Sequence, residues 1–244
     1  MASRNNYNNQ NNLDDWKPKT ELGLKVKKGD IVSIDSVFQN GYNILEPEVV
    51  EKLIPGIKSE VLLIGQAKGK YGGGQRRAFK QTRKKTKEGE KVGFSAMVAV
   101  GDHSGHVGIG LGRGSETFPT REKAKIKAKL NLISLRRGCG SWECGCKGNH
   151  SIPYAVEGKC GSLTIRLMSA PKGTGLKVEN EVAKVLELAG ISDVWSEVKG
   201  KSRSKINLIK AAFSALEKLQ DFRLRPEDVE NLGINQGSQK LKLN

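Results

Sequence analysis

The sequence is poor in apolar and aromatic residues, and this limits what the protein can be. Hydrophobic residues make up 36% of its 244 residues, which is below the usual range for a soluble globular domain. We therefore expect thin or divided cores that a partner helps to stabilise. The sequence contains no run of about 18 apolar residues, so we expect no membrane-spanning segment. Aromatic residues make up only 5%, which disfavours a protein that stacks single-stranded bases on aromatic rings.

Acidic residues are also scarce. Asp and Glu number 26 against 42 Lys and Arg, a formal net charge of +16. A clustered excess of this kind indicates a polyanionic partner, either nucleic acid or an anionic membrane surface. The opening MASRNNYNNQNN lacks the apolar centre of a secretory signal, so we expect an intracellular polyanion, RNA or DNA first. The alternative is a basic surface that only faces solvent.

The residues on which enzymes depend are few. There are three histidines, and no set of nucleophile, base and acid is visible. Gly108, Gly110, Gly112 and Gly114 recur every second residue, which is typical of a strand and not of a nucleotide-binding loop. The segment PKGTG (171–175) precedes a predicted helix and can cradle a phosphate, but a plain turn is the simpler interpretation. We therefore predict no catalytic activity and no small-molecule substrate.

The most basic segment spans residues 68–91, where three consecutive glycines interrupt a run of lysines and arginines. Such a segment has no apolar face to bury. We predict a long loop or hairpin that becomes ordered on a phosphate backbone, with a solvated linker as the alternative.

The remaining patterns predict an α+β protein of two small units joined near 136–151. Residues 93–100 and 107–114 are predicted to form a hairpin whose glycine face lets another backbone, or RNA, approach closely. Further strands are predicted at 61–64, 152–157, 162–170 and 193–198, and helices at 119–135, 178–190 and 203–219. The segment from residue 221 shows few signals of order.

Three of the four cysteines lie together as Cys139-x4-Cys144-x-Cys146, and His150 follows. Thiolates and imidazole are the ligands that Zn²⁺ prefers, and the surrounding glycines let the chain wrap an ion. We therefore predict one structural zinc. The fourth ligand is either His150 or Cys160, and a reduced Gly/Cys loop without metal is the alternative because the spacing is not a standard zinc pattern.

Two long stretches resemble the ribosomal small-subunit protein five family. GFSAMVAVGDHSGHVGIGLGRGSETFPTREKAKIKAKLNLISLRRG is similar to its N-terminal domain, and VEGKCGSLTIRLMSAPKGTGLKVENEVAKVLELAGISDVWSEVKG to its C-terminal domain. WKPKTELGLKV and CGSWECGC resemble the archaeal-type members. The resemblance covers residues 16–235 and departs from the family pattern at about 65–80, which we interpret as an insertion or a much-altered strand and loop.

The resemblance implies a domain order. The chain would begin with a disordered tail (1–15) and an N-terminal extension (16–60), followed by a double-stranded-RNA-binding-like domain with a basic loop (61–137). A Cys-rich linker (138–150) would lead to a two-layer C-terminal α/β domain (151–220), which contains a βαβ unit with a left-handed crossover. A tail (221–244) would end the chain.

The resemblance also implies a function and partners. The protein would be a cytoplasmic, non-catalytic constituent of the small ribosomal subunit that binds ribosomal RNA. It would contact small-subunit proteins four and eight, support decoding accuracy with protein four, and help form the mRNA entry channel. A basic duplex-RNA-binding module or chaperone outside the ribosome is the alternative.

Position by position, the resemblance and the charge pattern select candidate site residues. The RNA-binding candidates are Arg76, Arg77, Lys80, Arg83, Lys84, Lys85, Lys87, Lys91, Arg113, Lys123, Lys127, Arg136 and Arg137. The candidates for the interface with protein four are Lys172, Gly173, Thr174 and Gly175.

Overall fold

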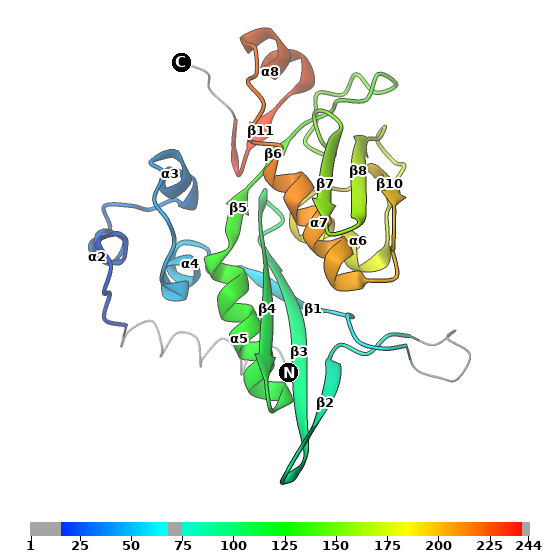
Figure 1. Ribbon diagram of the computed structural model, residues 1–244. Coiled ribbons are helices and arrows are strands. Elements are labelled where there is room, and N and C mark those ends of the chain that lie inside the picture. Colours follow the sequence, from blue (N-terminus) through cyan, green and yellow to red (C-terminus); the bar gives the residue numbers. More distant parts are fainter. Residues whose placement is uncertain (1–15, 68–74, 241–244) are drawn as a thin grey trace. The chain divides into compact units, whose positions relative to one another are not determined.

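The computed structural model describes residues 16–67 and 75–240 (Figure 1). Along the chain it divides into two compact units, the first ending at Ile57 and the second beginning at Lys58. The predicted tail at 1–15, part of the predicted insertion (68–74) and residues 241–244 lie outside the described residues.

The first unit is helical. It contains α2 (Glu21–Lys28), α3 (Ile34–Gln39) and α4 (Pro47–Leu53). The carboxylate of Glu46, just before α4, accepts hydrogen bonds from Trp16 Nε1 at 2.9 Å and from the Lys19 and Thr20 N–H groups at 2.8 and 2.7 Å. The Thr20 hydroxyl in turn accepts from the Gly23 N–H and caps α2. One carboxylate thus joins the beginning of this unit to its last helix.

The second unit begins with a five-stranded antiparallel sheet. Its strands are β1 (Lys58–Leu62), β2 (Lys80–Thr86), β3 (Gly89–Gly101), β4 (His106–Gly114) and β5 (Leu132–Ser134). The order is β1-β3-β4-β5, and β2 also pairs with β3. Because β1 pairs with the second half of β3 and β2 with the first half, the two short strands follow one another along β3 (Figure 1). The predicted β3–β4 hairpin is confirmed.

The glycine face of β4 is covered by a helix of the same unit, α5 (Thr117–Leu130). A Cβ atom added at Gly108, Gly110 or Gly112 would lie 2.2 Å from a backbone oxygen of α5 or its first turn. Of the two partners that the sequence left open for this face, another backbone or RNA, the backbone is therefore the one present. α5 is shorter than the predicted helix 119–135, because the chain turns after Asn131 and enters β5.

A second, four-stranded sheet follows. It contains β7 (Val156–Cys160), β8 (Leu163–Ser169), β9 (Leu176–Lys177) and β10 (Val194–Lys199) in the order β7-β8-β10-β9. β9 and β10 are parallel and joined by α6 (Asn180–Leu188), so the predicted βαβ unit is present. α7 (Lys205–Glu217) packs on β7 and β8, and α6 contacts β3 and β1 of the first sheet. The first predicted strand here is displaced, since residues 152–155 precede β7 and are not in a strand.

The expectation of little order after residue 221 was wrong. α8 (Pro226–Leu232) forms there, and β11 (Asn235–Gln236) pairs with both β12 (Gln239–Lys240) and β6 (Arg136–Arg137). The C-terminal segment thus returns to the middle of the chain and completes a small third sheet. Pairing between residues a hundred positions apart leaves no local periodicity in the sequence, which is why it was missed.

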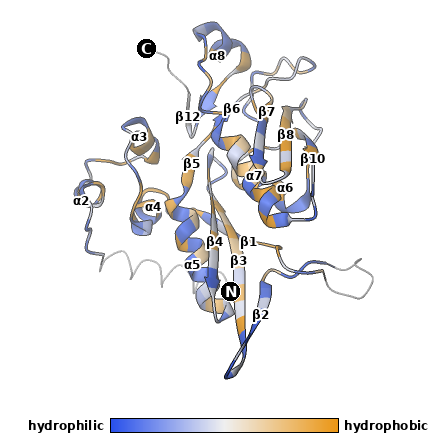
Figure 2. Ribbon diagram, in the orientation of Figure 1, coloured by the Kyte–Doolittle hydropathy of each residue, from blue (hydrophilic) through white to orange (hydrophobic). Residues whose placement is uncertain are grey.

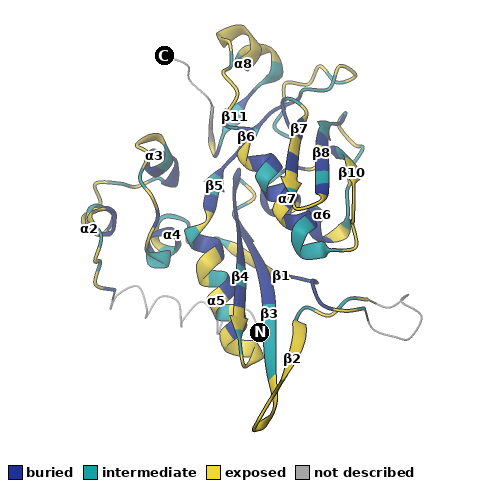
Figure 3. Ribbon diagram, viewed as in Figure 1, coloured by how far each residue is buried: buried dark blue, intermediate teal, exposed yellow. Residues whose placement is uncertain are grey.

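Both sheets share one hydrophobic core. It contains Met97 and Ile109 of the first sheet, Ile165 of the second, and Leu186 and Ile209 of the helices α6 and α7. Among the strands of the first sheet, β2 is the one that is exposed along its length, and it is largely hydrophilic, as Figures 2 and 3 show. The mixed α/β class is confirmed, and the core of the second unit is continuous across both of its sheets. Within the described ranges, no helix is long and apolar enough to cross a bilayer.

Candidate functional site

The first candidate site is the hairpin of β2 and β3. Every residue of β2 is exposed, as are the first three of β3. The two strands meet through a two-residue turn at Lys87 and Glu88, and Gly89 follows it with φ +122°. The prediction of a loop or hairpin that cannot bury itself is confirmed for residues 80–91.

The register gives this hairpin two chemically different faces. Lys84 lies opposite Lys91, and Lys80 opposite Ser95, whose other neighbour is Arg113 on β4. Because side chains alternate along a strand, these four cations project from one face, which we call the basic face. It is defined by Lys80, Lys84, Lys91 and Arg113.

The opposite face of the hairpin carries both charges. Glu90 is the one acidic residue of β2, β3 and β4, all three of which are fully described. It lies opposite Lys85 and accepts from Arg83 Nη1 at 3.3 Å. Both partners of that ion pair are largely exposed, so it contributes little to stability. Because Glu90 lies on this opposite face, no acidic side chain of the three strands offsets the positive charge of the basic face.

The other predicted RNA-binding residues are distributed around this hairpin. Lys87 lies in its turn, and Lys123 and Lys127 are exposed on α5. Arg76 is half-buried, because its guanidinium donates to the carbonyls of Gly65 at 3.3 Å and Arg203 at 3.4 Å. Arg77 is exposed, and its backbone N–H bonds Gln66.

Arg136 and Arg137 have a structural role that the sequence did not reveal. Arg137 is 8% exposed. Its guanidinium donates to four backbone carbonyls at 2.6–3.3 Å, those of His103, Ser104, Gly190 and Gly237. Arg136 Nη1 donates to the Phe222 carbonyl at 2.6 Å. Arg137 therefore holds loops of the second unit together and has no surface to offer RNA, and we omit it from the proposed interface.

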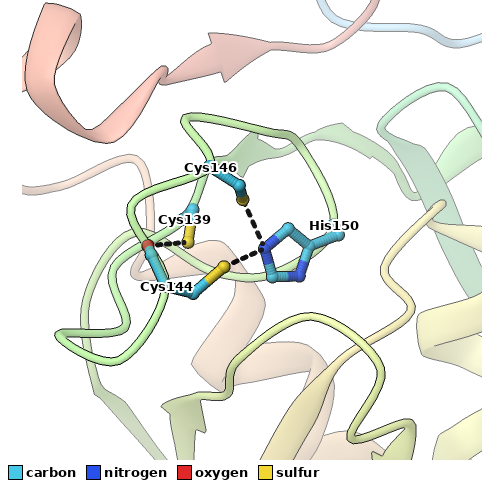
Figure 4. Close-up of side chains that lie close together, drawn as sticks. All are labelled: Cys139, Cys144, Cys146 and His150. Atoms are coloured by element: carbon cyan, nitrogen blue, oxygen red, sulfur yellow. Dashed lines mark hydrogen bonds between the residues drawn. The ribbon is translucent and has the colours of Figure 1, made fainter.

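The second candidate site is the cysteine cluster (Figure 4). The Sγ atoms of Cys139, Cys144 and Cys146 and a ring nitrogen of His150 all lie within 4.8 Å of one another. His150 Nε2 is 3.1 Å from Cys146 Sγ and 3.9 Å from Cys144 Sγ. Three soft sulfur donors and one imidazole are a donor set suited to zinc. The residues present therefore fit a tetrahedral metal ion.

The surroundings of the cluster favour a thiolate at Cys144 and disfavour one at Cys139. The pKa of the Cys144 thiol is lowered to about 6, first by the backbone N–H of Lys172 and then by the Cys146 thiol. Burial raises the pKa of Cys139 to about 11, and its Sγ donates to the Cys144 carbonyl at 3.0 Å. A thiolate is the form that binds a metal, so Cys144 is the thiol best prepared for an ion.

His150 is oriented from behind by Asp193. Its Nδ1 lies 2.9 Å from Asp193 Oδ2, and both side chains are largely buried. Burial raises the pKa of Asp193, but hydrogen bonds from the Gly175 N–H, the Ser192 hydroxyl and His150 outweigh this effect and hold the pKa below its usual value. A carboxylate on one ring nitrogen directs the other toward the sulfur atoms. Sequence reasoning missed Asp193, which lies 43 residues beyond His150.

The geometry decides between the two candidates for the fourth ligand. His150 belongs to the cluster, whereas Cys160 lies at the end of β7 and packs against the hydrophobic core. The residues 138–150, predicted as a linker, thus form a compact loop around the cluster. Trp142 in this loop is 91% exposed.

The segment 171–175 forms a tight turn before β9. Gly173 and Gly175 have φ of +91° and +73°, which other residues rarely adopt. Their N–H groups donate to Asp193 Oδ1 at 3.1 and 2.8 Å. These amides therefore already have an acceptor in the protein, which favours the interpretation of this segment as a turn and not as a phosphate site.

Comparison with known proteins finds similarity to one family over most of the chain. Residues 76–136 match the family model "Ribosomal protein S5, N-terminal domain", and residues 158–230 match "Ribosomal protein S5, C-terminal domain". The chain is 45% identical over 227 residues to the small ribosomal subunit protein uS5 of Nanoarchaeum equitans, and 44% identical over 227 residues to that of Methanocaldococcus jannaschii. Each alignment covers 93% of this chain and 97% of the relative.

Proposed function

Because this chain belongs to the ribosomal protein S5 family, we propose that it is a structural constituent of the small ribosomal subunit. It acts there by binding ribosomal RNA and performs no catalysis. The ribosome of the cytoplasm is accordingly its place of action.

The observation that carries this proposal is the basic face. Lys80, Lys84, Lys91 and Arg113 project from one face of an exposed hairpin, and Glu90, the one carboxylate of its strands, lies on the other. Such a surface matches a phosphate backbone, because each contact releases condensed counterions and strengthens binding. The exposed lysines Lys123 and Lys127 belong to α5, which covers the opposite, glycine face of β4, and we propose them as additional RNA contacts.

The family suggests finer roles as well. We include in the proposal that the protein helps form the mRNA entry channel, contacts small-subunit proteins four and eight, and supports decoding accuracy with protein four. The segment Lys172–Gly175 is the proposed contact with protein four, because Lys172 and Gly173 are exposed on a turn whose glycine amides are hydrogen-bonded to Asp193.

Sedimentation tests the main proposal. The purified chain, mixed with small subunits depleted of their own copy, should co-migrate with the subunit at physiological salt. A chain that stays at the top of the gradient, yet binds generic duplex RNA stably, would instead support the alternative of an RNA-binding module or chaperone outside the ribosome.

We further infer that the cysteine cluster holds one structural zinc ion, bound by Cys139, Cys144, Cys146 and His150. A bound ion would cross-link a loop that contains little regular structure. Elemental analysis of the purified chain should find about one zinc per molecule. A folded wild-type chain without metal would refute this inference.

A further inference from the structure

Asp193 makes contacts in two directions at once. Its Oδ2 atom lies 2.9 Å from Nδ1 of His150, a proposed metal ligand. Its Oδ1 atom accepts from the N–H groups of Gly173 and Gly175 at 3.1 and 2.8 Å. The side chain is only 5% exposed, so water competes little for these bonds. One carboxylate therefore connects the cysteine cluster to the turn at 171–175.

A second connection runs beside the first. The backbone N–H of Lys172 lies close enough to the Cys144 thiol to lower its pKa. The turn thus contacts two of the four proposed ligands, one through Asp193 and one directly. Its remaining hydrogen bonds are local: Thr174 donates twice to the Pro171 carbonyl, and the Val194 N–H donates to the Gly175 carbonyl at 3.3 Å.

We propose that metal bound at the cysteine cluster orders the exposed turn at Lys172–Gly175 through Asp193 and the Lys172 N–H, so that the cluster controls the shape of this turn. This inference rests on the proposed zinc site and deepens it. Asp193 is a positioning residue, since it contacts a ligand and the turn but not the ion.

The physical reason lies in the positions of two proposed ligands. An ion held by Nε2 of His150 and Sγ of Cys144 would fix both side chains, and the carboxylate that orients His150 is the one that accepts from the turn. Without the ion, both side chains are freer to move. Both supports of the turn then weaken together. Coupling between two sites is reciprocal, so a partner that binds the turn would tighten the hold on the metal by the same factor.

Amide hydrogen exchange of the full chain, measured with zinc bound and after removal by EDTA, tests the coupling. We expect exchange at Gly173 and Gly175 to accelerate roughly tenfold on metal removal, which corresponds to the loss of about one ordinary hydrogen bond. The amide of Ile165, inside β8 and fully buried, serves as the internal reference and should change little.

An Asp193→Asn variant tests the route. The asparagine keeps one oxygen that can accept from the Gly173 and Gly175 amides. Its NH₂ group replaces the second oxygen and cannot accept a hydrogen bond from His150. We expect zinc affinity to fall by about 10- to 100-fold and the absorption bands of the cobalt-substituted chain to shift. Glu157→Gln, a change at an exposed carboxylate of β7, is the matched control and should leave both unchanged.

The outcomes separate the two proposals. If zinc binds but its removal leaves exchange at Gly173 and Gly175 unchanged, the coupling is refuted while the metal site stands. An equal acceleration at Ile165 would also refute it, because the metal would then hold the whole unit and not the turn. If the wild-type chain binds no zinc, the metal site and the coupling are both refuted.

Discussion

Lys84 of β2 lies directly opposite Lys91 of β3, so that two ammonium groups face each other across an exposed strand pair. Like charges in this position destabilise a sheet. The neighbouring pair on the opposite face, Lys85 and Glu90, is complementary. One acidic residue in place of Lys84 or Lys91 would remove the repulsion on this face. The retained pair of lysines is expected if their positive charge binds a polyanionic partner.

Replacing Lys91 with Glu should separate stability from binding. The change turns a repulsive pair with Lys84 into an attractive one, and we expect the folded state to gain about 0.2–1 kcal/mol. RNA affinity should fall nevertheless. Denaturant unfolding and filter binding of the same preparation measure both quantities. Lys85→Glu, which places two carboxylates opposite each other, is the matched control and should lower stability instead.

Replacing Arg137 with Lys should affect folding and not RNA binding. One ammonium cannot reach the four carbonyls that the guanidinium satisfies, and we expect a loss of about 1–3 kcal/mol. Arg113→Lys on the basic face should change stability by no more than about 0.5 kcal/mol. If the folded Arg137→Lys variant lost RNA affinity to the same extent as the Lys91→Glu variant, the assignment of Arg137 as a structural residue would be wrong.

Unfolding in acid should depend on Asp102. This carboxylate lies 2.7 Å from Nδ1 of the buried His106 at the β3–β4 turn. Burial raises the pKa of Asp102, but the hydrogen bond and charge of His106 and the N–H groups of Ser104 and His106 outweigh it and lower the pKa below 3.8. A carboxylate whose pKa is lower in the folded protein than in the unfolded chain contributes stability that is fully present above the pKa of the unfolded chain. This contribution is lost as the pH falls through the pKa of the folded protein.

We therefore expect wild-type stability to decline as the pH falls below about 4, and the Asp102→Ala variant to show a flatter decline there. At neutral pH the variant should be less stable by about 1–3 kcal/mol, because His106 loses its buried partner. Urea unfolding at a series of pH values measures both effects. Parallel curves for the two proteins below pH 4 would show that Asp102 is not the responsible group.

Cys146→Ser and Cys160→Ser form a matched pair. Cys146 lies 3.1 Å from His150 in the cluster, whereas Cys160 packs against the core at the end of β7. We expect the first variant to lose zinc and to melt at a lower temperature, and the second to keep about one zinc per chain. Loss of zinc from the Cys160 variant alone would reverse the assignment of the fourth ligand.

Local patterns in the sequence predicted the longer strands and helices of the second unit. The alternation in 93–100 and 107–114 predicted β3 and β4, and Gly190, with φ +77°, ends the region of α6 as expected. The cluster of Cys139, Cys144 and Cys146 was likewise visible from spacing, because its members are close in the chain. In each case the determining interactions lie within about fifteen residues.

Several features that were missed depend on distant contacts, although the short, locally capped helices α2 and α3 were missed too. Asp193 reaches His150 across 43 residues, and β11 pairs with Arg136 and Arg137 across about a hundred. The burial of Arg137 follows from that pairing, which is why its charge alone suggested an RNA contact. The basic face was also invisible, because the composition shows the charge but only the strand register shows on which side each lysine projects.

The central claim is that the basic face neutralises an RNA backbone, and the salt dependence of binding tests it most directly. Affinity for small-subunit ribosomal RNA should be measured over a series of salt concentrations for the wild type and for a variant with Lys80, Lys84, Lys91 and Arg113 changed to Ala. We expect the slope of log K against log salt to become shallower by about 3 in the variant, since each phosphate contact contributes about 0.7–0.9. An unchanged slope, in a variant that remains folded, would contradict the account.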